Sequence, residues 1–194
     1  MSAADQLALQ PWELLSTKDV LQTKWFTIHE QQMRTPTGAD ATYYVHDSLD
    51  SVICLCLTPD NKIILEKQYR PPIERVSYDF PSGSMEPEDQ DPAAGIKREL
   101  HQELGFQSSS LTEIGVMDTN PGFSKVRVHV FLAHGEMSEP SAQEPTERVV
   151  PVLVSPAELL QYIDDGKLAC TFCISTTFLA FRHLGLLPTN LTKQ

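Results

Sequence analysis

The sequence predicts an α/β fold, with one layered main domain and a small N-terminal β segment before it. Three observations support this. Apolar strand-like runs and helical patterns interleave along the chain, as in layered α/β domains. The length of 194 residues and the hydrophobic fraction of 41% suit one main domain with a real core. Residues 1–50 carry only short strand patterns. We therefore expect the β segment at residues 1–50 and the main domain at 51–194.

The first block reads as a small sheet with a hairpin. Short, partly alternating strand patterns occur at residues 12–15 and 25–29. The turn signal Thr35-Pro-Thr-Gly38 separates a strand pattern at residues 31–34 from another at 41–46. These two runs are expected to pair.

The main domain opens with a buried strand. Residues 51–57 are nearly all apolar, which suits a strand covered on both faces. After it the patterns predict further strands and then helices, with an acidic, Pro-rich loop at 136–146. The strands are expected at residues 63–70, 76–80, 112–117, 127–133 and 149–154, and the later helices at 156–164 and 171–184.

Composition narrows the possible partners. The formal net charge of −11 argues against a nucleic-acid partner, because phosphate backbones are bound by clustered Lys and Arg. A small anionic substrate stays possible if a metal ion or a few arginines offset the global charge. We expect no membrane partner and a cytoplasmic location, since no run approaches the ~18 apolar residues of a membrane span and the start of the chain does not resemble a secretion signal.

Four cysteines raise the question of a metal site or a disulfide. Cys54 and Cys56 alternate with apolar residues in a strand-like run, where cysteine acts as a small hydrophobe. Cys170 and Cys173 open an apolar helical stretch. We expect reduced core thiols, with zinc or a disulfide as the less favoured alternative.

One predicted helix has both ends marked. Asp91 is a good N-cap, Pro92 suits the first helical position, and Gly105 suits the left-handed position just past the end. At about 100° per residue, one narrow apolar stripe becomes the expected buried face. It comprises Ala93, Ile96, Leu100 and Leu104.

Two carboxylates follow the margin of that stripe. Glu99 and Glu103 are four residues apart, so they lie on the same side of the helix and repel each other. A divalent cation with a preference for hard oxygen ligands, such as Mg²⁺, would turn this repulsion into a binding site. The pair alone is also compatible with ordinary solvated carboxylates, softened by Lys97 and Arg98.

The surrounding pattern resembles the Nudix box, Gly-x5-Glu-x7-Arg-Glu-U-x-Glu-Glu-x-Gly-U, where U is apolar. The resemblance implies an α/β/α sandwich with a mixed sheet and a Mg²⁺ cofactor, with Mn²⁺ as a substitute. By the same resemblance, Glu99 and Glu103 are catalytic metal ligands, Ser82 adds its backbone carbonyl, Gly83 lies at the substrate, and Arg98 orients the carboxylates. The matching residues are Gly83, Arg98, Glu99, Leu100, Glu103, Gly105 and Phe106.

The chain departs from the box in two places. The interval from Gly83 to Arg98 is one residue longer than the pattern, so either Glu88 or Asp89 stands for the first box glutamate. Gln102 replaces the first glutamate of the Glu-Glu pair. An amide keeps an oxygen ligand but loses a charge, which predicts weaker metal binding or fewer bound metal ions.

Features outside the box resemble the ADP-ribose and nucleoside diphosphate sugar branch of the family. Residues 67–72 are similar to its Gln-(Phe/Tyr)-Arg segment, which implies that Arg70 contacts phosphate. Pro121, fifteen residues after Phe106, matches that branch's marker for ADP-ribose hydrolysis. The opening segment resembles a part that forms a homodimer and shapes the nucleoside pocket. Its candidates for stacking on adenine are Trp25, Tyr43 and Tyr44.

The resemblance implies a Mg²⁺-dependent hydrolase that cleaves ADP-ribose to AMP and ribose 5-phosphate, or cleaves a related nucleoside diphosphate sugar. Glu147 is the expected general base, with Glu144 in reserve. The alternative is a Nudix-fold module that binds ADP-ribose or another nucleotide without hydrolysing it.

Overall fold

A computed structural model describes residues 6, 9–138 and 148–187. The chain divides into two compact units. The first contains residues 1–50 and 118–127, and the second contains residues 51–117 and 128–194. The segment 118–127, which carries Pro121, therefore groups with the N-terminal residues and not with the unit that carries the helix of residues 91–105.

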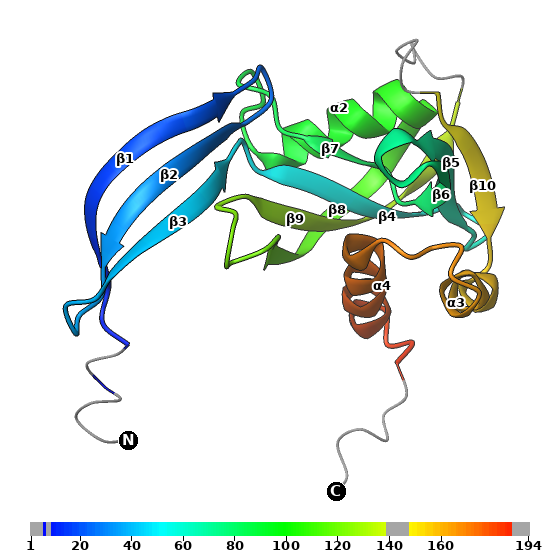
Figure 1. Cartoon of the computed structure of the whole chain (residues 1–194). Coiled ribbons are helices and arrows are strands. Elements are labelled where there is room, and N and C mark those ends of the chain that lie inside the picture. Colours follow the sequence, from blue (N-terminus) through cyan, green and yellow to red (C-terminus); the bar gives the residue numbers. More distant parts are fainter. Residues whose placement is uncertain (1–5, 7–8, 139–147, 188–194) are drawn as a thin grey trace, which may run out of the picture. The chain divides into compact units, whose positions relative to one another are not determined.

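The first unit is built on a three-stranded antiparallel sheet of order β1-β2-β3 (Figure 1). Its strands are β1 (Glu13–Gln22), β2 (Thr27–Arg34) and β3 (Asp40–Asp47). The predicted hairpin turn is confirmed, with Gly38 at φ 88° and the Thr35 amide donating to the Ala39 carbonyl at 2.8 Å. The first strand is much longer than the expected residues 12–15.

The second unit contains a mixed sheet. β4 and β9 are parallel, and β10, β5 and β4 are joined by antiparallel pairing, in the order β10-β5-β4-β9-β8. β6 pairs with β5, β7 pairs with β4, and a 3-10 turn η1 (Pro71–Ile73) precedes β6. The strands are β4 (Ser51–Leu57), β5 (Ile63–Arg70), β6 (Arg75–Asp79), β7 (Ser82–Ser84), β8 (Phe106–Asp118), β9 (Arg127–Met137) and β10 (Val150–Val154).

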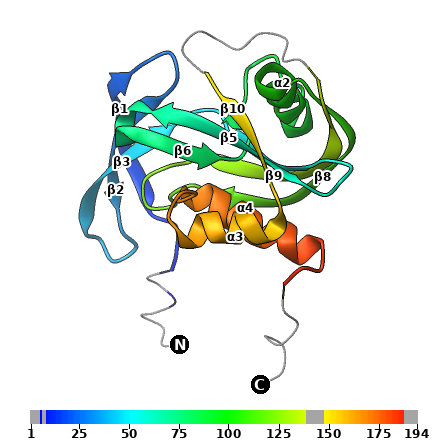
Figure 2. The ribbon, with the colours of Figure 1, turned by 90° about the vertical axis from the view of Figure 1, so that its right-hand side faces the viewer.

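Helices cover both faces of this sheet. Figure 2 shows α2 (Pro92–Leu104) on one side, and α3 (Pro156–Asp164) and α4 (Thr171–His183) on the other. Alternate residues of β4 supply two separate cores, since Cys54 and Cys56 pack with α2 whereas Leu55 and Leu57 pack with α3 and α4. The predicted α/β/α sandwich with a mixed sheet and a small N-terminal β segment is confirmed.

Helix α2 begins and ends as its sequence predicts. The Asp91 carboxylate accepts from the Ala94 amide at 2.8 Å, and Gly105 closes the helix at φ 60°. Ile96, Leu100 and Leu104 are buried against the sheet. This packing fixes the rotation of α2 and brings the margin that carries Glu99 and Glu103 to the edge of the core.

The sheet opens next to α2. β5 pairs with β4 at Ile63 and Ile64, but from Glu66 onward the partner on that edge is β6. On β4, the residues before Cys54 pair with β7, and the Cys54 amide donates to the Pro81 carbonyl at 3.0 Å. The opening therefore lies between Glu66 on one strand and the start of β7 on another.

Within the described residues, no helix combines the length and apolar character needed to cross a membrane.

Candidate functional site

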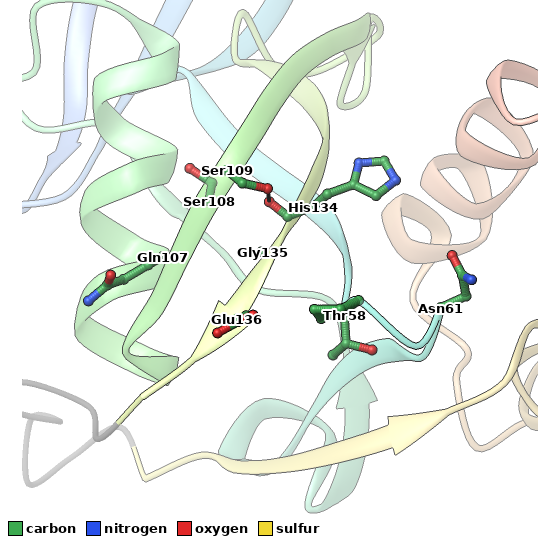
Figure 3. Close-up of a pocket in the computed structure, with 9 residues that line it drawn as sticks. Thr58, Asn61, Gln107, Ser108, Ser109, His134, Gly135 and Glu136 are labelled. Carbon is green, nitrogen blue, oxygen red and sulfur yellow. Dashed lines mark hydrogen bonds between the residues drawn. The ribbon is translucent and has the colours of Figure 1, made fainter.

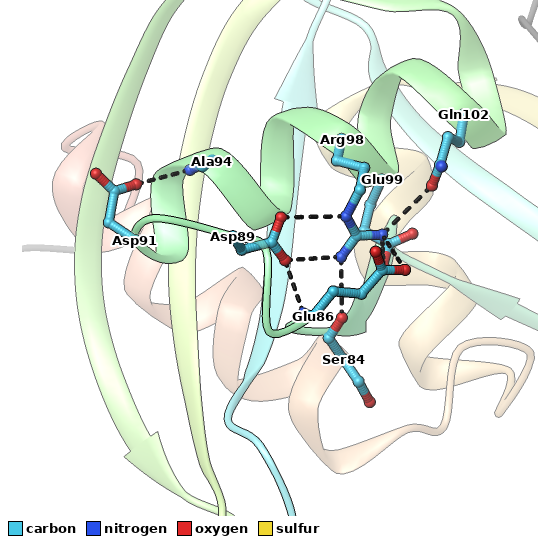
Figure 4. A network of polar contacts seen from close by, with 8 residues as sticks. All are labelled: Ser84, Glu86, Asp89, Asp91, Ala94, Arg98, Glu99 and Gln102. Atoms are coloured by element: carbon cyan, nitrogen blue, oxygen red, sulfur yellow. Dashed lines mark hydrogen bonds and ion pairs between the residues drawn. The ribbon is translucent and has the colours of Figure 1, made fainter. Parts of the chain in front are cut away.

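Arg98 ties the box loop to helix α2. Its Nε and Nη2 donate to both carboxylate oxygens of Asp89, at 3.2 and 2.9 Å (Figure 4). Nη2 also donates to the Ser84 carbonyl at 3.1 Å, and Nη1 donates to Glu99 Oε1 at 2.9 Å. These bonds come from three nitrogens of a planar guanidinium, and a lysine, with three donors on one nitrogen, cannot reproduce the pair to both Asp89 oxygens together with the other two. Arg98 thus positions Glu99 relative to the loop.

Asp89, not Glu88, takes the place of the first box glutamate. The Asp89 side chain is 7% exposed and pairs with Arg98, and it also accepts from the Glu86 amide at 2.8 Å. The Arg98 guanidinium holds the pKa of Asp89 below its ordinary value. Glu88 is exposed on the surface of the loop.

Glu99 lies directly against Gly83. A Cβ atom added at Gly83 would fall 2.0 Å from Glu99 Oε1, so only glycine leaves room for this carboxylate. Ser82 precedes this glycine on β7 and pairs with Ile53 of β4. Of the predicted metal-binding residues, the structure therefore brings Glu99 next to the Ser82–Gly83 strand, one helical turn from Glu103.

A residue that the sequence analysis did not select, Glu66, meets Glu103 at the opening of the sheet. Ile64 packs with the α2 core whereas Ile63 and Leu65 pack on the other face, so the alternation of β5 directs Glu66 toward α2. Its carboxyl faces that of Glu103, and the residue is only 2% exposed. Burial and then the Glu103 carboxyl raise the pKa of Glu66 well above its ordinary range.

The signal for Glu66 was present in the sequence but was not used. Glu66 interrupts the apolar run Ile63-Ile-Leu65 in a strand predicted to be buried. A buried carboxyl costs free energy unless it is paired or binds a metal, so its position in such a strand indicates a function.

Arg70 lies at the far end of the same strand. Its Nε donates to Asp79 Oδ2 at 3.0 Å, and its side chain is 40% exposed. The Arg70 charge acts on Glu66, which places it in the electrostatic surroundings of the two buried carboxyls. The structure thus gathers Arg70 and Glu66 of β5 and Glu103 of α2 at the opening.

The donors present fit a hard divalent cation. Glu66, Glu99 and Glu103 offer carboxylate oxygens, and Glu66 Oε1 is buried with no hydrogen-bond partner among the described residues. Because residue 83 is glycine, the Glu99 carboxylate occupies the space that a side chain at position 83 would fill. Oxygen ligands of this kind are those that Mg²⁺ and Mn²⁺ prefer.

The remaining predicted site residues lie elsewhere or outside the described part of the chain. Pro121 belongs to the first unit, where the Phe123 and Ser124 amides that follow it donate to the Asn120 carbonyl. Glu147 and the reserve base Glu144 fall outside the described residues.

The three aromatic candidates for base stacking all belong to the first unit. Trp25 is 70% exposed. Tyr44 donates to Glu30 at 2.9 Å, and Tyr43 packs edge-on against Trp12.

A pocket of about 440 Å³ lies away from these carboxylates (Figure 3). It is found at the Thr58 end of β4, whereas the candidate site lies at the Ser51–Ile53 end, where β7 pairs. Its lining is mainly small polar side chains, including Ser108, Ser109 and Asn61. None of the carboxylates and arginines of the candidate site lines this pocket, so the pocket is not part of that site.

We expect Arg98→Lys to destabilise the protein by about 1–3 kcal/mol, because a single ammonium cannot keep both bonds to Asp89 together with those to Glu99 and the Ser84 carbonyl. Urea unfolding followed by circular dichroism measures the change. The reciprocal exchange Lys97→Arg, at an exposed neighbouring position, is the matched control and should leave the midpoint unchanged. Equal stability of Arg98→Lys and wild type would contradict the structural role of the guanidinium.

The four cysteines are free thiols in the structure, and Cys54, Cys56 and Cys173 are buried in the core as predicted. Cys170, which is half-buried, forms the N-cap of α4. Sulfur atoms of Cys170 and Cys173 lie within 4.8 Å of each other and of an Asp79 carboxylate oxygen. The hydrogen bond from the Cys173 thiol lowers the pKa of Cys170 to about 6.

We expect the alkylation of Cys170 by iodoacetamide to rise with a midpoint near pH 6, because the reactive species is the thiolate. Mass spectrometry of the labelled protein across a pH series measures it. The midpoint is the readout, since a thiolate of low pKa is also a weaker nucleophile. Cys173→Ala should move the midpoint toward the ordinary value of about 8.5. A wild-type midpoint already near that value would contradict the assignment.

Comparison with known proteins agrees with this geometry. The model of the NUDIX domain matches residues 47–171, and that of the nucleoside diphosphate sugar hydrolase N-terminal domain matches residues 12–46. The chain belongs to the Nudix family.

Individual relatives give a narrower similarity. An ADP-ribose pyrophosphatase of Bacillus subtilis is 31% identical over 119 residues, which are 61% of this chain and 64% of that protein. A methanol dehydrogenase activator of Bacillus methanolicus is 25% identical over 89% of this chain and 91% of its own length. A crystal structure of an ADP compounds hydrolase, at 20% identity, superposes with a TM-score of 0.78 over 92% of this chain and 98% of that one, which shows the shared fold.

Proposed function

We propose that this protein is a Mg²⁺-dependent pyrophosphatase that hydrolyses ADP-ribose to AMP and ribose 5-phosphate. The observations that support the proposal are that the Glu99 carboxylate lies against Gly83 and that Glu103, one helical turn along α2, faces the buried Glu66, with Arg70 close enough to act on Glu66. The similarity to ADP-ribose pyrophosphatases supports the choice of substrate. A related nucleoside diphosphate sugar is the next candidate within the same reaction.

Each residue has a distinct task in this proposal. Glu99, Glu103 and the Ser82 carbonyl hold the cation, and Arg98 fixes the Glu99 carboxylate through their 2.9 Å contact. Arg70 binds the diphosphate with the part of its guanidinium that does not face Asp79. When bound, Mg²⁺ neutralises diphosphate charge and lowers the pKa of an attacking water. Gly83 keeps the approach to Glu99 open, and Pro121 stays a proposed substrate contact.

The proposed general base is Glu147, with Glu144 in reserve. The described strand that follows supports this choice, because β10 begins with Val150 opposite Lys67 and places Pro151 opposite Glu66. The chain therefore enters β10 at the end of β5 that carries the buried carboxyl and Arg70.

We also propose a homodimer and a cytoplasmic location. The first unit exposes several large apolar side chains, with Leu14, Leu15 and Leu21 of β1 between 40% and 51% exposed. Light scattering after size exclusion should give twice the 21.7 kDa chain mass. A single-chain mass at micromolar concentration would overturn the dimer. Free thiols fit a reducing compartment.

The test is AMP release from ADP-ribose by purified protein with Mg²⁺, compared with chelator alone and with a panel of nucleoside diphosphate sugars. We expect cleavage that depends on the cation and is fastest for ADP-ribose. Faster cleavage of another panel member would make that compound the proposed substrate and leave the proposed reaction, hydrolysis of a diphosphate bond, unchanged.

Gln102 supports one competing proposal, a module that binds ADP-ribose without hydrolysing it. Its Oε1 accepts from Arg98 at 3.3 Å, at a position where the Nudix box has a carboxylate. Saturable ADP-ribose binding without AMP release from any panel member would establish that alternative and exclude the enzyme.

A further inference from the structure

Glu66 is a buried acid for which the Nudix box has no role. It enters the site from β5, not from the loop and helix that carry the box, and it is 2% exposed. One of its oxygens, Oε1, is buried with no hydrogen-bond partner among the described residues. A buried polar atom without a partner is uncommon in native proteins and indicates a bound ligand, a water molecule or a functional role.

Acidic side chains predominate among the charged neighbours of Glu66, which is unfavourable for a carboxyl with a purely structural role. Glu66 faces the Glu103 carboxyl, and the charge of Asp79 also opposes its ionisation. Two carboxyls can share a hydrogen bond only if one carries a proton, and two ionised ones repel. A cation bound between them satisfies both carboxylates and the free oxygen together.

The box itself lacks one charge at this site. Gln102 stands where the Nudix pattern has glutamate, and it is exposed, with its Oε1 turned to Arg98 at 3.3 Å. Glu66 lies at the point where β5 leaves β4 and pairs with β6, beside the strand that begins with Ser82. The carboxylate that α2 lacks at Gln102 is therefore matched by the Glu66 carboxyl on β5, across the opening from α2.

We propose that Glu66 is a third carboxylate ligand of the divalent cation, supplied by β5 in place of the box carboxylate that Gln102 has lost. The proposal rests on the metal-dependent function above. It makes the cation bridge helix α2 and strand β5, so that binding connects the two sides of the opening.

The experiment is direct titration of the metal-free protein with Mn²⁺. Binding is measured in two ways, by calorimetry and by the loss of the electron paramagnetic resonance signal of free Mn²⁺. Neither readout needs substrate or turnover. Glu66→Gln keeps the shape of the side chain and removes its charge. We expect it to weaken Mn²⁺ binding at the Glu103 site by about tenfold or more. Glu113→Gln, which removes an exposed carboxylate on β8, is the matched control and should bind as wild type does.

Two further measurements separate a ligand from a structural acid. Without metal, Glu66→Gln should unfold at a higher temperature than wild type, because it removes a buried acid that opposes Glu103. Saturating Mn²⁺ should raise the melting temperature of Glu66→Gln by less than it raises that of the wild-type protein. Adding Gln102→Glu should recover part of the lost affinity, since it returns a carboxylate to α2.

Unchanged Mn²⁺ affinity in Glu66→Gln would overturn the proposal and leave Glu66 as a protonated partner of Glu103. No recovery with Gln102→Glu would overturn the idea that Glu66 replaces the box carboxylate. These outcomes are independent of the proposed reaction, because a protein that binds Mn²⁺ through Glu66 but releases no AMP would refute the hydrolase and not the ligand.

Discussion

Glu103→Gln is expected to lower the kcat for AMP release by about a thousandfold. The substitution keeps the length of the side chain but replaces a charged oxygen ligand by a neutral amide. A bound cation contributes several kcal/mol to charge stabilisation, and each 1.36 kcal/mol corresponds to a factor of ten in rate. Steady-state kinetics across a Mg²⁺ series measures the effect.

The fold should survive this change, because Glu103 Oε2 is buried beside Glu66 and an amide can donate to the neighbouring carboxylate. Glu88→Gln, an exposed acid in the box loop, serves as the control and should keep full activity. A Glu103→Gln enzyme that retains a tenth or more of the wild-type rate would exclude the α2 carboxylate from the metal site.

Gly83→Ala is expected to lower the rate by about a hundredfold with little loss of stability. The new methyl carbon would fall 2.0 Å from Glu99 Oε1, so the carboxylate must retreat by roughly 1 Å. The end of a glutamate moves at small cost, but a misplacement of that size in a catalytic group can cost about two orders of magnitude.

Gly115→Ala provides the control for crowding, because its new carbon would meet Leu179 Cδ1 at 3.1 Å, the flexible end of an apolar side chain far from the box. Thermal unfolding and kcat are measured for both variants. A Gly83→Ala protein with full activity would show that Glu99 does not need its position against β7. Loss of stability without a change in kcat would give Gly83 a purely structural role.

Local pattern was enough to predict the elements whose chemistry is local. The Asp91 cap, Pro92 and Gly105 define α2 because capping and left-handed geometry involve only neighbouring residues. The apolar run of residues 51–57 predicted β4 because it is buried on both faces. Strand β8 was predicted too short, since its first part, with Ser109 and Ser110 exposed, lacks the apolar alternation that identifies a strand.

By itself, the sequence determined the class of fold, the helix with its two carboxylates and the resemblance to the Nudix box, because each of these is written in residues close together along the chain. Only the tertiary structure decided that Asp89 pairs with Arg98, that Glu66 reaches Glu103, and that Pro121 groups with the N-terminal unit. Those contacts depend on strand register and on how β5 leaves β4. A register is set by pairing between distant segments, and a shift of one residue would turn Glu66 to the opposite face.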